Sequence, residues 1–464
     1  MRRSALLISV LLTPLFGQVR PSASWVRLQE AALASEEGYQ KLGWLCDRIG
    51  NRLSGSKQLE QAIQWAVTTM KAEGFDNVHT EKVMVPHWVR GREFGELLSP
   101  KPTRLNLLGL GGTAPTPKGG LTADVVVVGS FEELKALGEA KVKGKIVCFD
   151  VPFTDYGTTV AYRGNGAIEA AKLGGVAALI RSVSPVSLDT PHTGAMRYDK
   201  DVPRIPAAAL TLESTTQMRR MQERGDRITM KLELENKTLP DIESANVVAE
   251  IRGSEKPEEI VLISGHLDSW DVGQGAQDDG VGCMNVWEAA RLIRQVGLKP
   301  KRTIRVVLFT NEENGLRGGL AYRDAHKAEL PLHLAMLESD GGNGLIRGFE
   351  LELAGIRGGG NQASAEALPS AQTEILEKLR AFAPAFETLG GGIFAAGHSG
   401  ADIGPSVQLG VPGIGVDHHG GHYWDIHHTW ADTFDKVDKK TMQKNIAIIA
   451  TLTYLLADLP GTLQ

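Results

Sequence analysis

The sequence ISGHLDS at residues 263–269 indicates the architecture of the chain, because an apolar run ends there in a histidine that an aspartate follows closely. Runs that are apolar throughout are typical of strands covered on both faces of a sheet. Further strand-like runs and one helical apolar pattern lie at 246–251, 259–264, 303–310, 334–337 and, for the helix, 280–296. We therefore predict a mixed α/β sheet flanked by helices on both faces. One of its strands would deliver His266 to the edge where ligands gather in open α/β folds.

Three further segments carry carboxylates beside predicted strand or helix ends: QDDG at 277–280, NEENG at 311–315 and ESDGG at 338–342. Two adjacent carboxylates repel each other unless a positive charge lies between them. A carboxylate can bridge two cations with one oxygen on each, which a neutral imidazole cannot do. Each segment alone has a plainer interpretation, as a helix N-cap or a solvated acidic loop. Together they favour a metal site.

The candidate ligands come from these segments and from the histidine-rich segment DHHGGHYWDIHHTWADT at 417–433. They are His266, Asp278, Glu313, Asp340 and His428. Glu312 stands directly before a ligand and is placed to act as a base. Asp268 is placed to accept a hydrogen bond from the ring nitrogen of His266 that faces away from the metal. Two metals in an oxygen-rich site beside a free carboxylate predict hydrolysis.

The length and the net charge of the chain restrict the number of domains and the class of protein. A chain of 464 residues is long enough for two or three domains. Its net charge is −5 and it has no basic run, so binding to nucleic acid has no electrostatic support.

The N-terminus has the layout of a secretory signal peptide, which we place at residues 1–22. Arg2 and Arg3 precede an apolar run at 5–16 that small and polar residues follow. The run is too short for a membrane-spanning helix, which needs about 20 apolar residues. A buried N-terminal helix is the other interpretation, but Pro14 interrupts the run. We therefore expect an exported protein with no stable insertion in the membrane.

The middle of the chain differs in character from the rest. A Pro- and Gly-rich stretch at 100–120 indicates a boundary, and short apolar strands with one helix at 166–173 follow over 121–237. Titratable residues in this part are scattered and form no cluster. We predict a self-contained accessory module inserted into a larger fold.

The motif set GHLDSW, QDDGVG, NEENG, ESDGG and HHTWADT resembles metallopeptidase family 28, the two-zinc aminopeptidases and their relatives. The resemblance is strongest to the carboxypeptidase Q subfamily, also called plasma glutamate carboxypeptidase, and its bacterial homologues. It implies a zinc-peptidase fold whose catalytic domain comprises 25–120 and 240–464. The module at 121–237 would be the mostly-β protease-associated domain that these enzymes carry as an insertion.

The resemblance also implies a role for each candidate residue. His266 and Asp340 would hold one zinc ion and Glu313 with His428 the other, with Asp278 bridging them. His428 is preferred to His427 because it begins the H-T-x-x-D-T pattern of the family. Glu312 would be the general base, and Asp268 the partner of His266. Relatives have a cis peptide bond at the position of Asp278–Asp279, and a loop near the substrate at the position of His398.

The predicted function is hydrolysis of short peptides by a secreted or periplasmic exopeptidase with two zinc ions per chain. A lysosomal or secretory location would apply in a eukaryotic host, and the resemblance implies a homodimer. The direction of cleavage stays open, because a carboxypeptidase, a dipeptidase and an aminopeptidase share the same metal site. A non-catalytic, receptor-like relative is a further alternative.

Overall fold

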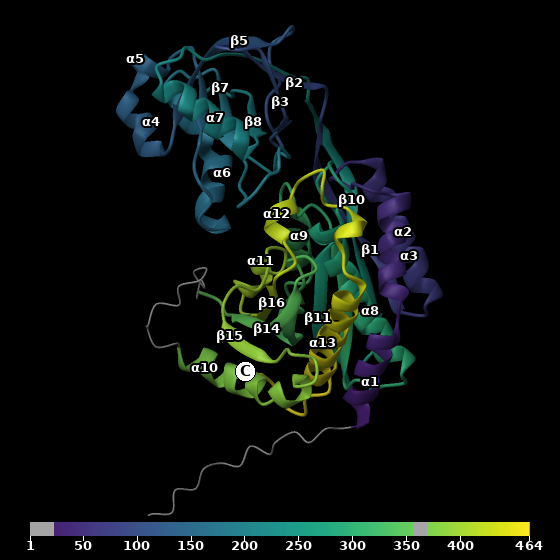
Figure 1. The fold of residues 1–464 in the computed structure, drawn as a ribbon. Coiled ribbons are helices and arrows are strands. Elements are labelled where there is room, and N and C mark those ends of the chain that lie inside the picture. The colour runs from purple at the N-terminus through teal and green to yellow at the C-terminus, as the bar shows by residue number, and fades with distance from the viewer. Residues whose placement is uncertain (1–22, 356–368, 464) are drawn as a thin grey trace, which may run out of the picture.

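The computed structural model describes residues 23–355 and 369–463 and divides into two units, each built on an eight-stranded sheet (Figure 1). The predicted signal peptide at 1–22 lies outside the described residues. The larger unit carries the sequence motifs of the candidate site, and the smaller unit is inserted between two of its strands.

The sheet of the larger unit has the order β1-β10-β12-β11-β13-β16-β14-β15. In that order the strands are Asp76–Val89, Lys237–Ile251, Arg302–Phe309, Lys256–His266, His333–Glu338, Gly413–His419, Leu345–Glu352 and Ile393–Ala396. Strands β12, β11, β13 and β16 run parallel, whereas β1, β10 and β14 each pair antiparallel with a neighbour. The sheet is therefore mixed, and the carboxyl ends of its four central strands meet at one edge.

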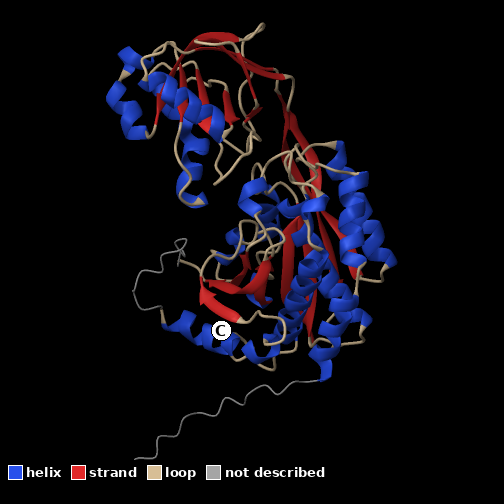
Figure 2. Ribbon diagram, in the orientation of Figure 1, coloured by secondary structure: helices blue, strands red, loops and turns tan. Residues whose placement is uncertain are grey.

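Helices cover both faces of this sheet, as predicted (Figure 2). On one face lie α1 Ala23–Ala34, α2 Glu37–Arg48, α3 Lys57–Ala72, α8 Val281–Gln295 and α13 Lys439–Ala457. On the other lie α9 Arg317–Ala325 and α11 Gly404–Val407. In β11, the side chains of Val261 and Ile263 pack in the core on the face that α8 and α13 cover. Those of Ile260 and Leu262 pack in the core on the face that α9 and α11 cover. This alternation explains why residues 260–263 of the strand are all apolar.

The remaining helical segments of this unit are short or peripheral. They are α10 Ser370–Arg380, α12 Tyr423–Ile426, the π-helical turn η1 Ala276–Gly280, and the 3-10 turns η2 Leu330–Leu332, η3 Ala383–Phe386 and η4 Phe434–Lys436. Local signals fix the longer helices: the Ser56 hydroxyl caps α3 by accepting the Leu59 N–H at 3.1 Å, and the Asp438 carboxylate caps α13.

The smaller unit has the strand order β3-β2-β9-β5-β6-β7-β8-β4. These strands are Thr103–Leu105, Glu93–Ser99, Thr229–Leu234, Leu121–Val128, Ile146–Phe149, Ala177–Arg181, Ala207–Leu210 and Leu107–Gly109. Four helices accompany them: α4 Phe131–Leu137, α5 Glu139–Val142, α6 Tyr156–Lys172 and α7 Leu212–Glu223.

Two expectations about this unit need correction. Strands β2 to β4, at residues 93–109, belong to its sheet, although the sequence analysis placed them in the catalytic part. The Pro- and Gly-rich stretch that suggested a boundary at 100–120 instead connects strands within the unit. The unit is also not mostly β, because helices pack on its sheet as well.

The two units are joined by the long antiparallel pair β1 and β10, whose register runs from Asp76 opposite Glu250 to Val89 opposite Lys237. Figure 1 shows the smaller unit above the larger one, with α6 extending downward toward α12. Within the part of the chain that the structure describes, no helix combines the length and the apolar character needed to cross a membrane.

Candidate metal centre

The carboxyl edge of the parallel strands brings the predicted ligands together. His266 is the last residue of β11, Glu312 and Glu313 follow β12, and Asp340 follows β13. The turn η1 supplies Asp278 from the start of α8. His428 arrives from the loop after α12. Residues separated by 162 positions in the sequence thus face one another, and all of the predicted ligands lie in this cluster.

Asp278 lies at the centre of the cluster, and its two carboxylate oxygens face different histidines. Oδ1 lies 3.3 Å from His266 Nε2, and Oδ2 lies 3.1 Å from His428 Nε2. His266 Nε2 is also 3.8 Å from Asp340 Oδ2, and His428 Nε2 is 3.0 Å from Glu313 Oε2. The ligands therefore fall into two groups that share Asp278.

The main chain around Asp278 is fixed by neighbouring carboxylates. Asp432 accepts the N–H groups of Gln277 at 2.8 Å and of Asp278 at 3.2 Å. The Asp278–Asp279 peptide bond is cis, as the family resemblance implied. Asp279 Oδ2 accepts the main-chain N–H of His266 at 3.1 Å and so links η1 to the end of β11.

Asp268 occupies a different position from the one we expected. His266 Nδ1 lies 3.1 Å from the main-chain carbonyl of Asp268 and 3.9 Å from its carboxylate, so the carbonyl is the hydrogen-bond acceptor. The carboxylate instead accepts the N–H of Glu312 at 3.1 Å and that of Glu313 at 3.3 Å. An H-x-D pattern does not distinguish main-chain from side-chain acceptance, which explains the error. The Asp268 carboxylate therefore positions the acidic pair, whereas its main-chain carbonyl holds the ring of His266.

The smaller unit holds the loop that carries His428. The Thr193 N–H donates to the His428 carbonyl at 3.0 Å, and the Thr193 carbonyl lies 3.2 Å from His428 Nδ1. A proton on Nδ1 leaves the lone pair of Nε2 free to coordinate a metal. Burial lowers the pKa of His428, and the nearby Arg163 lowers it further, whereas Asp278 raises it. The net effect is a lowered pKa, which favours the neutral imidazole that a metal ligand requires.

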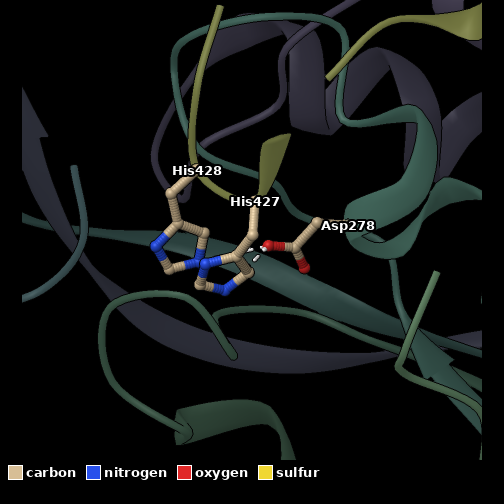
Figure 3. A group of neighbouring side chains, drawn as sticks. All are labelled: Asp278, His427 and His428. Carbon is tan, nitrogen blue, oxygen red and sulfur yellow. Dashed lines mark ion pairs between the residues drawn. The ribbon is translucent and has the colours of Figure 1, made fainter. Parts of the chain in front are cut away.

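His427 is a neighbour that the sequence analysis set aside. Its ring stacks on that of His428 with centroids 3.5 Å apart, and its Nε2 lies 3.6 Å from Asp278 Oδ2 (Figure 3). Both histidines thus face the same carboxylate, and His428 is the nearer of the two. The pair of adjacent histidines was the only sequence signal for His427.

The charges of the cluster are unbalanced within the protein alone. Burial raises the pKa values of Glu312 and Glu313 well above the usual range, and the like charges around them raise these values further. Burial also opposes ionisation of Asp278, but the close imidazole rings of His266 and His428 outweigh it and hold that pKa well below its usual range. Divalent cations would compensate the repulsion between the remaining carboxylates.

The donor atoms fit a metal of the zinc type. His266 Nε2 and Asp278 Oδ2 are buried and have no hydrogen-bond partner among the described residues, although both point into the cluster. Imidazole nitrogens with carboxylate oxygens form the ligand set that zinc takes in hydrolytic sites. A buried polar atom without a partner is costly, and coordination of a metal would remove that cost.

A cavity of about 660 Å³ opens above the cluster between the two units. Its wall includes five of the candidate residues: Asp278, Glu312, Glu313, Asp340 and His428. It also includes Tyr156, Arg163 and Tyr423, which the sequence analysis did not single out. The Tyr423 hydroxyl donates to Asp340 Oδ1 at 3.4 Å.

His398 does not take the place we expected for it. The residue is exposed and is not among the residues that line the cavity. Its main-chain N–H donates to Glu350 Oε2 at 3.0 Å, and Glu350 does line the cavity. In this structure the loop that carries His398 therefore contacts a residue of the cavity wall through its main chain rather than through the imidazole.

The fold is that of a peptidase of family M28. The sequence profile described as peptidase family M28 matches residues 246–453, a range that contains every candidate site residue. Mouse carboxypeptidase Q is 43% identical over 421 residues, which cover 91% of this chain and 86% of that protein. The chain belongs to peptidase family M28, and the predicted fold class and enzyme class are confirmed.

Three further comparisons extend this similarity. Human carboxypeptidase Q is 42% identical over 426 residues, covering 92% of this chain and 86% of its own. A solved structure described as a peptidase M28 precursor from Shewanella amazonensis has a TM-score of 0.88 at 36% identity, with 95% of this chain and 97% of that chain covered. A zinc aminopeptidase from Bacillus subtilis shares the fold, with a TM-score of 0.66 at 20% identity and coverage of 92% and 96%.

Proposed function

We propose that this chain is an exported exopeptidase that uses two zinc ions to hydrolyse short peptides with a free carboxyl terminus. The observation that carries the proposal is the geometry of Asp278, whose two oxygens face His266 and His428 separately. One metal would be held by His266 and Asp340, and the other by Glu313 and His428. The names of the relatives support zinc and support cleavage beside a free carboxylate.

The protein's own residues supply the proton transfers. Zinc, when bound, polarises the scissile carbonyl and makes water acidic enough to react near neutral pH. Glu312 is half-buried at the cavity wall, and the Asp268 carboxylate accepts the main-chain N–H of Glu312 at 3.1 Å. Its carboxylate would accept a proton from the attacking water and deliver it to the leaving amine. Burial of Glu312 favours the protonated form that the second transfer requires.

The wall of the cavity favours short substrates with both ends free. Outside the ligand set it carries the acidic residues Glu350, Asp417 and Asp425, which suit a protonated amine. An aminopeptidase that ignores the carboxylate is therefore the second candidate. The layout of residues 1–22 supports export, and the family resemblance extends the proposal to a homodimer.

The decisive experiment compares three substrates: a free dipeptide, its N-acetylated form and its C-terminal amide. We expect hydrolysis of the free dipeptide, with the amide spared. Cleavage of the amide at the rate of the free dipeptide, together with a block by acetylation, would assign an aminopeptidase. Glu312→Gln serves as the control variant, because it should retain the metals and lose turnover.

Asp278→Ala tests the metal assignment independently of activity. Loss of a ligand shared by both sites should weaken both metals together, as measured by zinc content after dialysis. Retention of two tightly bound zinc ions in Asp278→Ala would contradict the bridging role.

A further inference from the structure

A fully buried arginine close to the metal centre has no part in the proposed mechanism. Arg52 lies in the segment that joins α2 to α3, and none of its surface is exposed. Among the described residues no carboxylate forms an ion pair with Arg52, whereas the equally buried Arg302 pairs with Glu259 at 2.5 Å. A guanidinium that is removed from water without a carboxylate partner is energetically costly. The contacts that offset this cost therefore indicate what Arg52 does.

The first loop that Arg52 holds begins at the predicted ligand His266. The Nε of Arg52 donates to the Leu267 carbonyl at 2.7 Å, one residue after that ligand. The Arg52 N–H donates to Ser269 Oγ at 3.0 Å, and the Ser269 N–H donates to the Arg52 carbonyl at 3.3 Å. The main chain that follows His266 is therefore attached to Arg52 by three hydrogen bonds.

The second loop that Arg52 holds leads into the turn η1, which supplies Asp278. The Nη1 of Arg52 donates to the Gln274 carbonyl at 2.8 Å, and its Nη2 donates to the Gly275 carbonyl at 3.0 Å. Gly275 has a φ of +59°, and a Cβ at that residue would lie 2.4 Å from Ser269 Cβ and 3.0 Å from Arg52 Nη1. Glycine permits this close approach, so the two loops meet at the guanidinium.

The segment that carries Arg52 also contacts the loop of the acidic pair. Ser54 is buried, and its hydroxyl donates to Asp268 Oδ2 at 3.4 Å and accepts a hydrogen bond from Asn311 Nδ2 at 3.0 Å. The Asp268 carboxylate in turn accepts the main-chain N–H groups of the acidic pair that follows Asn311. Three loops that carry predicted site residues therefore contact residues 52–54.

The guanidinium of Arg52 joins two loops that supply ligands to the same centre. His266 Nε2 and Asp278 Oδ1 lie 3.3 Å apart, and each side chain projects from one of these loops. The N–H groups of a guanidinium point in fixed directions within one plane, so Arg52 sets the relative position of the carbonyls that it binds. Loops that were free to move would have to be ordered when a metal binds, and the entropy lost would weaken binding.

We propose that Arg52 is a positioning residue, which holds His266 and Asp278 at the separation that the two-metal centre requires. The inference rests on the proposed function and adds a residue from the N-terminal part of the chain to it. Arg52 does not line the catalytic cavity, so it acts on the reaction only through the loops that carry the ligands.

The competing explanation is that Arg52 contributes only to the stability of the fold. A substitution would then lower the Tm and leave the metal centre of the folded protein unchanged. A positioning role instead changes the arrangement of the ligands while the protein stays folded. Cobalt(II) takes the same types of ligand as zinc, and its visible absorption spectrum depends on the geometry of those ligands. That spectrum separates the two explanations.

The experiment uses Arg52→Lys in the full-length chain, because lysine keeps the charge but replaces the planar group with a single ammonium. We expect the spectrum of the cobalt-substituted variant to differ from that of the wild type. Zinc affinity, measured by chelator competition, should fall by about 10- to 100-fold, as is typical when a group that orients metal ligands is lost. At saturating zinc, kcat on a free dipeptide should fall by a similar factor, whereas KM should stay within about twofold.

Arg302→Lys is the matched control, because Arg302 is also a fully buried arginine that binds main-chain carbonyls. It donates to the carbonyls of Leu459 and Gly461, and it begins β12, at the opposite end of that strand from the acidic pair. Arg302→Lys should lower the Tm but leave the cobalt spectrum, the zinc affinity and kcat at their wild-type values.

Each outcome has a distinct meaning. If the wild type does not bind two zinc ions, the proposed function fails and this inference fails with it. If the wild type binds two zinc ions but folded Arg52→Lys keeps the wild-type spectrum and zinc affinity, only the inference is overturned. Equal changes in Arg52→Lys and Arg302→Lys also overturn it. If Arg52→Lys does not fold, Ser269→Ala removes the hydroxyl that accepts the Arg52 N–H, and an unchanged cobalt spectrum in that variant overturns the inference.

Discussion

Replacing Asp268 with asparagine would test the role that the structure gives to this carboxylate. Asp268 is buried, and its two oxygens accept the N–H groups of Glu312 at 3.1 Å and Glu313 at 3.3 Å. The ring of His266 is held by the main-chain carbonyl of Asp268, which the substitution leaves in place. Asp268→Asn therefore disturbs the base and its neighbour without removing the acceptor for His266.

The size of the effect follows from the two hydrogen bonds. The amide of asparagine offers one oxygen, so one of the two N–H groups must lose its acceptor and face an NH₂ group. Hydrogen bonds to a charged acceptor contribute about 1.5–3 kcal/mol. At about 1.4 kcal/mol per factor of ten, this predicts a fall in kcat of about 10- to 150-fold.

The assay combines steady-state kinetics on a free dipeptide with zinc content after dialysis, and circular dichroism confirms folding. We expect the fall in kcat with zinc content retained, because the contacts of His266 are unchanged. Asp268→Ala should lose more activity, since it leaves both N–H groups without a partner. A wild-type kcat in Asp268→Asn would show that this carboxylate does not position the acidic pair. Selective loss of one zinc ion, with a normal kcat once zinc is added back, would show the same.

Two further predictions concern the contact between the units and the dependence of stability on pH. Thr193→Pro removes the N–H that binds the His428 carbonyl at 3.0 Å, so zinc affinity measured by chelator competition should fall by about tenfold, with Thr193→Ser unchanged. His326 Nδ1 lies 2.8 Å from Glu329 Oε2, and His326 Nε2 lies 2.7 Å from Glu81 Oε1. Burial lowers the pKa of His326, but these carboxylates raise it to about 9. A raised pKa in the folded state stabilises the protein below the unfolded value of 6.5, and this contribution is lost as pH rises toward about 9. Below the unfolded value, these ion pairs contribute up to about 3 kcal/mol to the free energy of unfolding. The difference in Tm between wild type and His326→Gln should therefore shrink as the pH rises over this range. A constant difference in Tm would show that the ion pairs do not act in this way.

The sequence predicted the catalytic unit well because its strands and helices follow simple patterns. The run at 259–264 proved to be the centre of β11, Lys256–His266, and the pattern at 280–296 proved to be α8, Val281–Gln295. The five predicted ligands lie close together because each lies at or close to the end of a strand or helix whose position is fixed by the sheet. Their order along the chain was enough to predict the cluster, although their roles as ligands remain a proposal.

The inserted unit was predicted less well, for two physical reasons. Helix α6 was expected only from Gly166, because Gly157, Thr158 and Gly164 are poor helix formers in its first half. That half carries Tyr156 and Arg163, and contacts with the larger unit hold it in place. No local pattern can reveal a contact between Arg163 and His428, which are 265 positions apart.

Diffraction data collected on both sides of the zinc absorption edge would show whether Asp278 joins two zinc ions. We expect two anomalous peaks about 3.5–4 Å apart, one beside His266 and the other beside His428, with one oxygen of Asp278 directed at each. A single peak in zinc-saturated, active crystals would contradict it, as would two peaks that Asp278 does not bridge.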